Sequence, residues 1–172
     1  YGIVESIDET SKLFSVSLNN GDTYKTQSII VASGASARLL GVPGEDDLLG
    51  FGVSTCATCD GAFFKGEDMI VVGGGDAAAE EASFLTKFAD TVYLVHRRDS
   101  LRAEAYWEKQ IKDHVKNGEV EILWNTEVTE IEGTQEDGIE TVSLISHPDG
   151  YPKQKPTEEV ERKKMDVGAV FI

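Results

Sequence analysis

The middle of the chain alternates between short apolar runs and longer segments in which apolar residues recur with helical spacing. Residues 69 to about 124 read as strand, helix, strand, helix, strand. The second helix is expected over roughly 102–116, with a stop near Asn117 and Gly118. This alternation predicts an α/β fold with a parallel sheet flanked by helices.

The first part of the chain has a different pattern. Residues 4–8 and 13–18 alternate as strands do, residues 19–22 form a strong hairpin turn, and 23–26 continue the meander. Residues 28–32 are a continuous apolar run that ends at Ser33, Gly34 and Ala35, which predicts a buried parallel strand leading into a ligand-facing turn. Such a strand needs neighbours, and the first 27 residues supply no parallel partner.

The last part predicts an antiparallel addition to the parallel sheet. Residues 127–131, 141–146 and 158–166 have strand-like patterns, with a turn at 148–150, and 167–172 form a buried strand. Residues 41–44 are rich in chain breakers and acidic residues follow them, so we expect a domain boundary there. The expected domains are 1–43, 44–166, and a return strand at 167–172.

Charge and composition narrow the class of protein. The chain has 172 residues, 16 Lys and Arg against 31 Asp and Glu, and a formal net charge of -15. An acidic chain of this kind is a poor partner for nucleic acid or an anionic membrane surface. Its apolar runs are far shorter than the roughly 20 residues of a membrane span, and its first residues do not resemble a signal peptide. We therefore expect a cytoplasmic protein.

A glycine turn joins the first predicted strand of the α/β unit to its helix. Gly73 and Gly75 allow a sharp turn and a close approach of backbone to ligand, and Ala78 is small enough for the helix to pack closely on the strand. The first N–H groups of the helix then face a pyrophosphate. A glycine turn between any strand and helix can look the same, so the context has to decide.

That context is a set of basic residues after the second strand. His96, Arg97 and Arg98 follow it directly, and Arg102 comes one helical turn later. An NAD site usually has an acidic residue there for the ribose 2′-hydroxyl. Guanidinium groups instead bind a 2′-phosphate with charge-assisted, bidentate geometry. The alternative is a solvated basic turn, but the glycines upstream favour an NADP(H) site.

Cys56 and Cys59 are the two cysteines of the chain and form a single C-x-x-C. At the first turn of a helix their sulfurs can reach one another, and the helix N-terminus stabilises a thiolate. Asp60 follows directly and could exchange a proton with a departing thiolate. Zinc requires four ligands, which the dispersed histidines do not supply, and the small polar neighbours do not look like a core strand around inert cysteines. A reversible dithiol/disulfide is the favoured interpretation, with no metal.

Nicotinamide delivers a hydride and does not reduce a disulfide directly at a useful rate, so a flavin is expected between them. The chain resembles the low-molecular-weight thioredoxin reductases, which are pyridine nucleotide-disulfide oxidoreductases. The resemblance rests on the order and spacing of four motifs, at residues 33–38, 56–61, 73–76 with 80–82, and 96–99 with Arg102. The resemblance runs from about Ile29 to the last residue and is looser over 133–166. It implies a Rossmann-like NAD(P)-binding domain with a partial FAD-domain segment.

The resemblance also implies roles for individual residues. Cys59 receives electrons from the flavin, Cys56 attacks the thioredoxin disulfide, and Asp60 donates the proton. The remaining residues are expected to bind cofactors: Gly73, Gly75 and Ala78 at the NADPH pyrophosphate, Arg97, Arg98 and Arg102 at the 2′-phosphate, Gly74, Asp76 and His96 within the same nucleotide site, and Ala32, Ser33 and Gly34 beside FAD. Ser33 stands where the family has threonine, which keeps the hydroxyl.

The resemblance makes thioredoxin the expected partner and a homodimer the expected state of the complete enzyme. The family's first glycine motif and its C-terminal FAD-binding stretch have no counterpart here, so we expect an internal part of the enzyme that lacks turnover by itself. Three alternatives remain. The first is a relative that feeds electrons to a peroxidase, but that group resembles NADH enzymes and the arginine cluster argues against it. The second is a dithiol oxidase, which uses oxygen and needs no NADPH site, so Arg97 and Arg98 argue against it also. The third is an NADP(H)-binding module without turnover.

Overall fold

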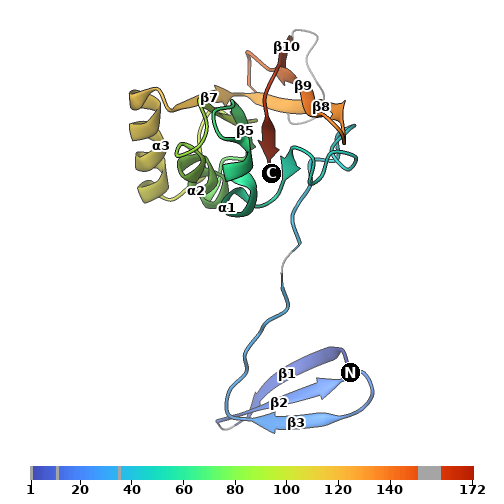
Figure 1. Ribbon diagram of the computed structural model, residues 1–172. Coiled ribbons are helices and arrows are strands. Elements are labelled where there is room, and N and C mark those ends of the chain that lie inside the picture. The colour runs from blue at the N-terminus through green and yellow to red at the C-terminus, as the bar shows by residue number, and fades with distance from the viewer. Residues whose placement is uncertain (1, 11, 35, 151–159) are drawn as a thin grey trace. The chain divides into compact units, whose positions relative to one another are not determined.

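The structure is a computed structural model that describes residues 2–10, 12–34, 36–150 and 160–172 (Figure 1). The chain forms two compact units, Tyr1–Ser36 and Ala37–Ile172, which are described separately. None of the helices in the described ranges is long and apolar enough to cross a membrane.

The first unit is the predicted antiparallel meander. Its strands are β1 (Val4–Thr10), β2 (Leu13–Leu18) and β3 (Thr23–Thr26), in the order β1-β2-β3. The turn between β2 and β3 is closed by the Leu18 N–H, which donates to the Asp22 carbonyl at 2.9 Å. These local predictions are confirmed.

The strand predicted at residues 28–32 is wrong. The described structure has no strand there, and the side chains of Ile30 and Val31 are 92% and 76% exposed. An apolar run becomes a buried strand only when neighbouring strands pair with its backbone and other side chains cover it. The sheet of the first unit pairs β1, β2 and β3 with one another and leaves this run outside. Ala35, in the turn predicted to follow, lies outside the described residues.

The second unit is built on a five-stranded parallel sheet, which confirms the predicted fold class. Three of its strands follow the predicted alternation, while one short strand comes from an earlier segment and another from the chain's end. The order is β4-β11-β5-β6-β7. The strands are β4 (Val53–Ser54), β5 (Met69–Val72), β6 (Val92–His96), β7 (Val120–Trp124) and β11 (Ala169–Phe171).

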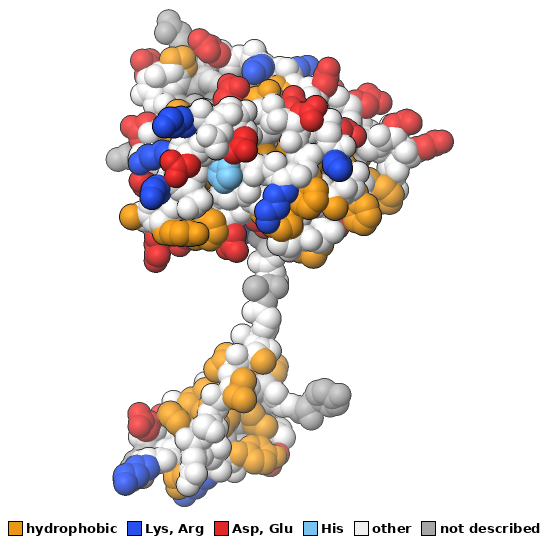
Figure 2. Space-filling model, turned by 60° about the vertical axis from the view of Figure 1, so that its left-hand side comes forward, with side chains coloured by type: hydrophobic (Ala, Val, Ile, Leu, Met, Phe, Trp, Pro, Cys, Tyr) orange, Lys and Arg blue, Asp and Glu red, His pale blue; other side chains and the backbone are white. Residues whose placement is uncertain are grey.

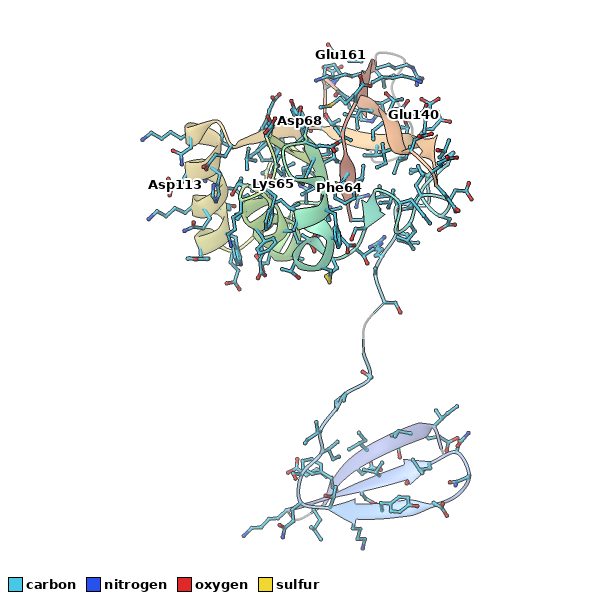
Figure 3. The ribbon with its side chains drawn as sticks, in the orientation of Figure 1. Phe64, Lys65, Asp68, Asp113, Glu140 and Glu161 are labelled. Carbon is cyan, nitrogen blue, oxygen red and sulfur yellow. A yellow bond between two sulfur atoms is a disulfide. The ribbon has the colours of Figure 1, made fainter. Side chains whose placement is uncertain are left out.

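The helices cover one face of this sheet (Figure 1). They are α1 (Ala57–Asp60), the 3₁₀ turn η1 (Gly61–Phe64), α2 (Asp76–Leu85) and α3 (Ala105–Asn117). Helix α3 ends as predicted, because Gly118 takes the left-handed conformation at φ 79°. It begins at Ala105 rather than near residue 102, because residues 97–104 form a loop. Phe64, labelled in Figure 3, packs edge-on against Phe171 with ring centroids 6.4 Å apart and so ties η1 to the sheet.

The opposite face of the parallel sheet carries the predicted antiparallel addition. Strands β8 (Thr126–Thr134), β9 (Gly138–Ser146) and β10 (Glu161–Met165) pair in the order β10-β9-β8. Residues 158 and 159 of the predicted last strand lie outside the described residues. Side chains of this sheet bury Ile70, Val95 and Val170 of the parallel sheet, while the helices bury its other face. The parallel strands are therefore continuous apolar runs, as their sequences indicate.

The segment before Pro43 lies with the second unit. The buried Glu45 carboxylate accepts the N–H groups of Leu40 and Gly41, each at 2.6 Å, and the side chain of Leu40 packs against the core beneath the antiparallel sheet. The two compact units thus divide after Ser36, earlier than the boundary expected near residue 43. The breaker-rich turn at 41–44 is held by the buried carboxylate and belongs to the second unit.

Candidate functional site

The predicted nucleotide and cysteine motifs lie at the carboxyl ends of the parallel strands. Strand β4 leads to Cys56, β5 leads to Gly73, and β6 leads to Arg97, all from their carboxyl ends. Because β11 alone separates β4 from β5, the cysteine motif and the glycine turn begin about 10 Å apart, or two strand spacings. Ligands of open α/β sheets bind outside the carboxyl ends of the strands.

The outer glycines of the turn differ in what surrounds them. A Cβ on Gly73 would lie 2.5 Å from the Cβ of Ala78, so both residues must be small for α2 to pack against the turn. A Cβ on Gly75 would meet nothing within 4 Å. Gly75 is the N-cap of the ten-residue helix α2, and no side chain caps the first N–H groups of α2. Such a helix start suits a phosphate.

Two hydrogen bonds fix the loop after β6 to this turn and to the start of α2, and a third fixes it to His96, the last residue of β6. The Arg102 N–H donates to the Gly74 carbonyl at 2.6 Å, and the Glu104 N–H donates to Asp76 Oδ1 at 2.6 Å. The His96 Nε2 lies 3.0 Å from the Ser100 carbonyl. Asp76 therefore anchors the arginine loop at the start of α2, a contact that its place in the sequence did not reveal.

His96 is a buried support of this loop. Its side chain is 5% exposed, and its ring occupies the space that a Cβ on Gly74 would need. Burial is the main cause that lowers the pKa of His96, and the charges of Arg102, Arg98 and Arg97 lower it further. The imidazole is therefore neutral at physiological pH and serves to position the loop.

A pocket of about 390 Å³ lies in front of the turn and the loop, and its lining includes Gly73, Gly74, His96, Arg97 and Arg102. The structure thus brings together five of the residues predicted to bind NADPH. Gly75, Asp76, Ala78 and Arg98 lie beside the pocket and outside its lining. Glu127 adds one carboxylate to the lining and lies 3.2 Å from His147 Nε2.

Arg38 also lines this pocket, and the sequence did not reveal it as a nucleotide-site residue. The resemblance groups Arg38 with the FAD-side segment, and a single arginine in an irregular segment carries no local signal. Basic and acidic side chains are interspersed on the face shown in Figure 2. By contrast, Arg38, Arg97 and Arg102 all line this one pocket and make a local positive site in an acidic protein.

Cys56 and Cys59 form a disulfide across the first turn of α1, with their Cα atoms 5.3 Å apart. Figure 3 draws sulfur, in yellow, beside α1. The side chain of Cys59 is exposed and that of Cys56 is partly buried, so an outside thiol can reach the pair. Within the described ranges, no three His, Cys, Asp or Glu side chains converge in a way that could hold a metal ion.

Two acidic side chains lie around α1. Asp60 Oδ2 accepts a hydrogen bond from Ser54 Oγ at 2.6 Å, and Ser54 Oγ accepts the Cys56 N–H at 3.0 Å. Glu81, on α2, hydrogen-bonds the Ala57 backbone, and burial is the main cause that raises its pKa. The cysteine helix is thus linked both to the sheet and to the helix of the glycine turn. The sequence indicated Asp60 but gave no role to Ser54, whose only signal is a hydroxyl in a buried strand.

Ala32, Ser33 and Gly34 belong to the first unit, where they are exposed. Gly34 has φ 74°, a conformation that favours glycine. Their contact with FAD stays a prediction.

The chain is similar to several known proteins. A family model for pyridine nucleotide-disulphide oxidoreductases matches residues 2–151. The chain is 46% identical over 151 residues to a thioredoxin reductase of Mycolicibacterium smegmatis, which covers 88% of this chain and 44% of that protein. It is 43% identical over 162 residues to a thioredoxin reductase of Listeria innocua, which covers 93% of this chain and 49% of that protein.

A solved thioredoxin reductase from Giardia duodenalis has the same fold, with a TM-score of 0.79 and 35% identity over 99% of this chain and 51% of that one. The chain therefore spans about half the length of the curated relatives it matches.

Proposed function

Since the chain belongs to the pyridine nucleotide-disulphide oxidoreductase family, we propose that it is the NADPH-binding and redox-disulfide part of a thioredoxin reductase. Electrons would pass from NADPH through FAD to the Cys56–Cys59 disulfide and on to thioredoxin. The observation that carries the proposal is that an arginine-lined pocket and an accessible disulfide lie at the carboxyl ends of strands of the same parallel sheet. A homodimeric complete enzyme in the cytoplasm belongs to the same proposal.

The described residues fit NADPH. The N–H groups at the start of α2 and the open space at Gly75 suit a pyrophosphate. Arg97 and Arg102 suit the 2′-phosphate, with the exposed Arg98 beside them. The imidazole of His96, which is neutral, and the side chain of Asp76 hold the arginine loop in place. NADPH supplies a hydride when bound, and FAD, for which we propose contact with Ala32, Ser33 and Gly34, supplies the two-electron relay to sulfur.

We assign the chemistry of the disulfide to three residues. Cys59 accepts electrons, and Cys56 attacks the disulfide of the partner as a thiolate. Asp60 exchanges a proton with a departing sulfur. The exposure of Cys59 and the accessible position of the pair support exchange with an outside dithiol.

Two measurements on the 172-residue chain test this function. Titration with NADPH and NADH, followed by thermal unfolding, should show stabilisation by NADPH at concentrations at which NADH has little effect, because a ligand stabilises the state that binds it. A chain stabilised equally by both nucleotides, or by neither, contradicts the NADPH assignment.

The second measurement is a single turnover with oxidised thioredoxin. The chain is reduced with dithiothreitol, freed of it, and mixed with thioredoxin, which should gain two thiols per chain. Cys56→Ser should not reduce thioredoxin, whereas Cys59→Ser should trap a mixed disulfide through Cys56. Failure of the wild-type chain to exchange contradicts thioredoxin as the partner.

A further inference from the structure

We propose that Ser54 is a positioning residue for the dithiol, and that its hydroxyl holds the Asp60 carboxyl in place to exchange a proton with a departing cysteine thiolate. This inference rests on the proposed disulfide chemistry and adds to it a residue outside the C-x-x-C-D motif.

The position of Ser54 is fixed by the sheet. Ser54 is the last residue of β4, its side chain is 5% exposed, and it pairs in register with Phe171 of β11. Its carbonyl accepts the Ile172 N–H at 3.0 Å. The Ser54 hydroxyl is therefore attached to a backbone that the sheet holds rigidly. Helix α1, which carries Asp60, has only four residues and is less rigid by itself.

The direction of the hydroxyl proton follows from the two contacts of Ser54 Oγ. The Cys56 N–H can only donate, so Oγ accepts it at 3.0 Å. The single O–H proton is then free to go to Asp60 Oδ2 at 2.6 Å. Among the described residues, no other side chain hydrogen-bonds Asp60. The other carboxyl oxygen, Oδ1, is left for proton exchange.

The step that this arrangement assists is balanced without any further reactant. A thiolate of an outside dithiol attacks one sulfur of the Cys56–Cys59 disulfide, a new S–S bond forms, and the electron pair of the old bond goes to the departing cysteine. That sulfur takes a proton from Asp60, which water re-protonates. The second thiol of the dithiol, as a thiolate, then attacks the dithiol sulfur of the mixed disulfide. This closes the dithiol's own disulfide, breaks the mixed disulfide and releases the other cysteine as a thiolate that takes a proton from water. The protein thus gains two electrons and two protons, and the dithiol loses them.

The test uses the oxidised 172-residue chain and its rate of reduction by dithiothreitol across a pH series. Ser54→Ala should slow reduction roughly tenfold and flatten its pH profile, because a general acid works only from a correct position. Ser54→Thr keeps the hydroxyl and should restore the rate. Thr55→Ala, which removes the hydroxyl of the exposed neighbour, is the matched control and should behave as wild type.

The decisive comparison is with Asp60→Asn. If Ser54 acts through Asp60, Ser54→Ala should add no further slowing to the Asp60→Asn chain. An equal slowing on both backgrounds, or a wild-type rate and pH profile for Ser54→Ala, overturns the inference while leaving the disulfide chemistry intact. A wild-type disulfide that dithiothreitol cannot open instead contradicts the proposed function itself. If Ser54→Ala does not fold, Ser54→Val, which has the shape of the Ser54→Thr variant without its hydroxyl, carries the same comparison.

Discussion

At the scale of single residues, the glycine turn contains two kinds of glycine. Gly73 is required by the packing of α2, because a Cβ there meets Ala78. Gly75 has φ -98° and open space around it, so the fold alone would tolerate a side chain. The absence of a side chain at Gly75 is therefore better explained by a ligand than by the fold.

Alanine at each position should separate these roles. Gly73→Ala should destabilise the chain by about 1–3 kcal/mol through overpacking. Gly75→Ala should cost less than about 1 kcal/mol of stability, the scale of an N-cap change, yet weaken NADPH binding. Urea unfolding and NADPH titration measure the two effects. Unchanged NADPH affinity in Gly75→Ala would remove this turn from the proposed nucleotide site.

The arginine loop gives a second prediction at this scale. Replacing Arg97 and Arg98 with alanine should weaken NADPH binding by about 2–4 kcal/mol, at roughly 1–2 per charge-assisted contact, and leave NADH nearly unchanged. Arg97→Ala alone should cost more than Arg98→Ala, because only Arg97 of the two lines the pocket. Arg162→Ala, exposed on β10, is the control. A double variant that still strongly prefers NADPH would refute the assignment.

At the scale of elements, the cysteine helix α1 depends on its neighbours. Four residues are too few for a stable helix in isolation, so its geometry comes from tertiary contacts. Ser54 of β4 contacts it from the sheet, and Glu81 of α2 contacts it from the helix of the glycine turn. The dithiol and the nucleotide turn are therefore mechanically connected through α2.

The contact of Glu81 predicts a pH dependence. Burial raises the pKa of Glu81 above its ordinary value of 4.5, so its contribution to stability is complete below pH 4.5 and is lost as pH rises through the folded-state pKa. Glu81→Gln keeps an acceptor for the Ala57 backbone and does not titrate. Relative to wild type, this variant should therefore gain stability from pH 4 to pH 7.

Urea midpoints at the two pH values measure the effect, with Glu136→Gln, exposed in the turn between β8 and β9, as control. If the difference between Glu81→Gln and wild type does not change with pH, the burial of this carboxyl has no energetic consequence.

At the scale of the whole molecule, the two units differ in how they are stabilised. Both described core clusters consist of residues from the second unit, beginning with Leu40. The first unit is a three-stranded sheet whose apolar side chains, such as Ile3 and Tyr24, are largely exposed. A small sheet without a covered face is marginal by itself.

Removal of residues 1–36 should therefore change the stability of the second unit by no more than about 0.5 kcal/mol, and the NADPH-induced shift in Tm should persist. Amide hydrogens of β1–β3 should exchange faster than those of β5 and β6. Calorimetry of both chains and hydrogen exchange of the full chain test this. A large loss of Tm in the shorter chain would show that the second unit is not an independent folding unit.

The sequence by itself determined the features that depend on local physics. The alternation of strands and helices over residues 69–124, the end of α3 at Gly118, the glycine turn and the pairing of Cys56 with Cys59 follow from backbone freedom, periodicity or short spacing. Turn geometry and helical period are encoded within a few residues. These features could therefore be read without knowing where the rest of the chain lies.

Only the tertiary structure decided how these local features meet. Residues 28–32 have the composition of a buried strand and are exposed, because a strand also needs partners. Strand β11, from the far end of the chain, inserts between β4 and β5 and thereby sets the distance between dithiol and nucleotide turn. Arg38 and Ser54 reach the site through the same packing. Contacts between distant segments depend on which surfaces bury one another, and no local pattern encodes that choice.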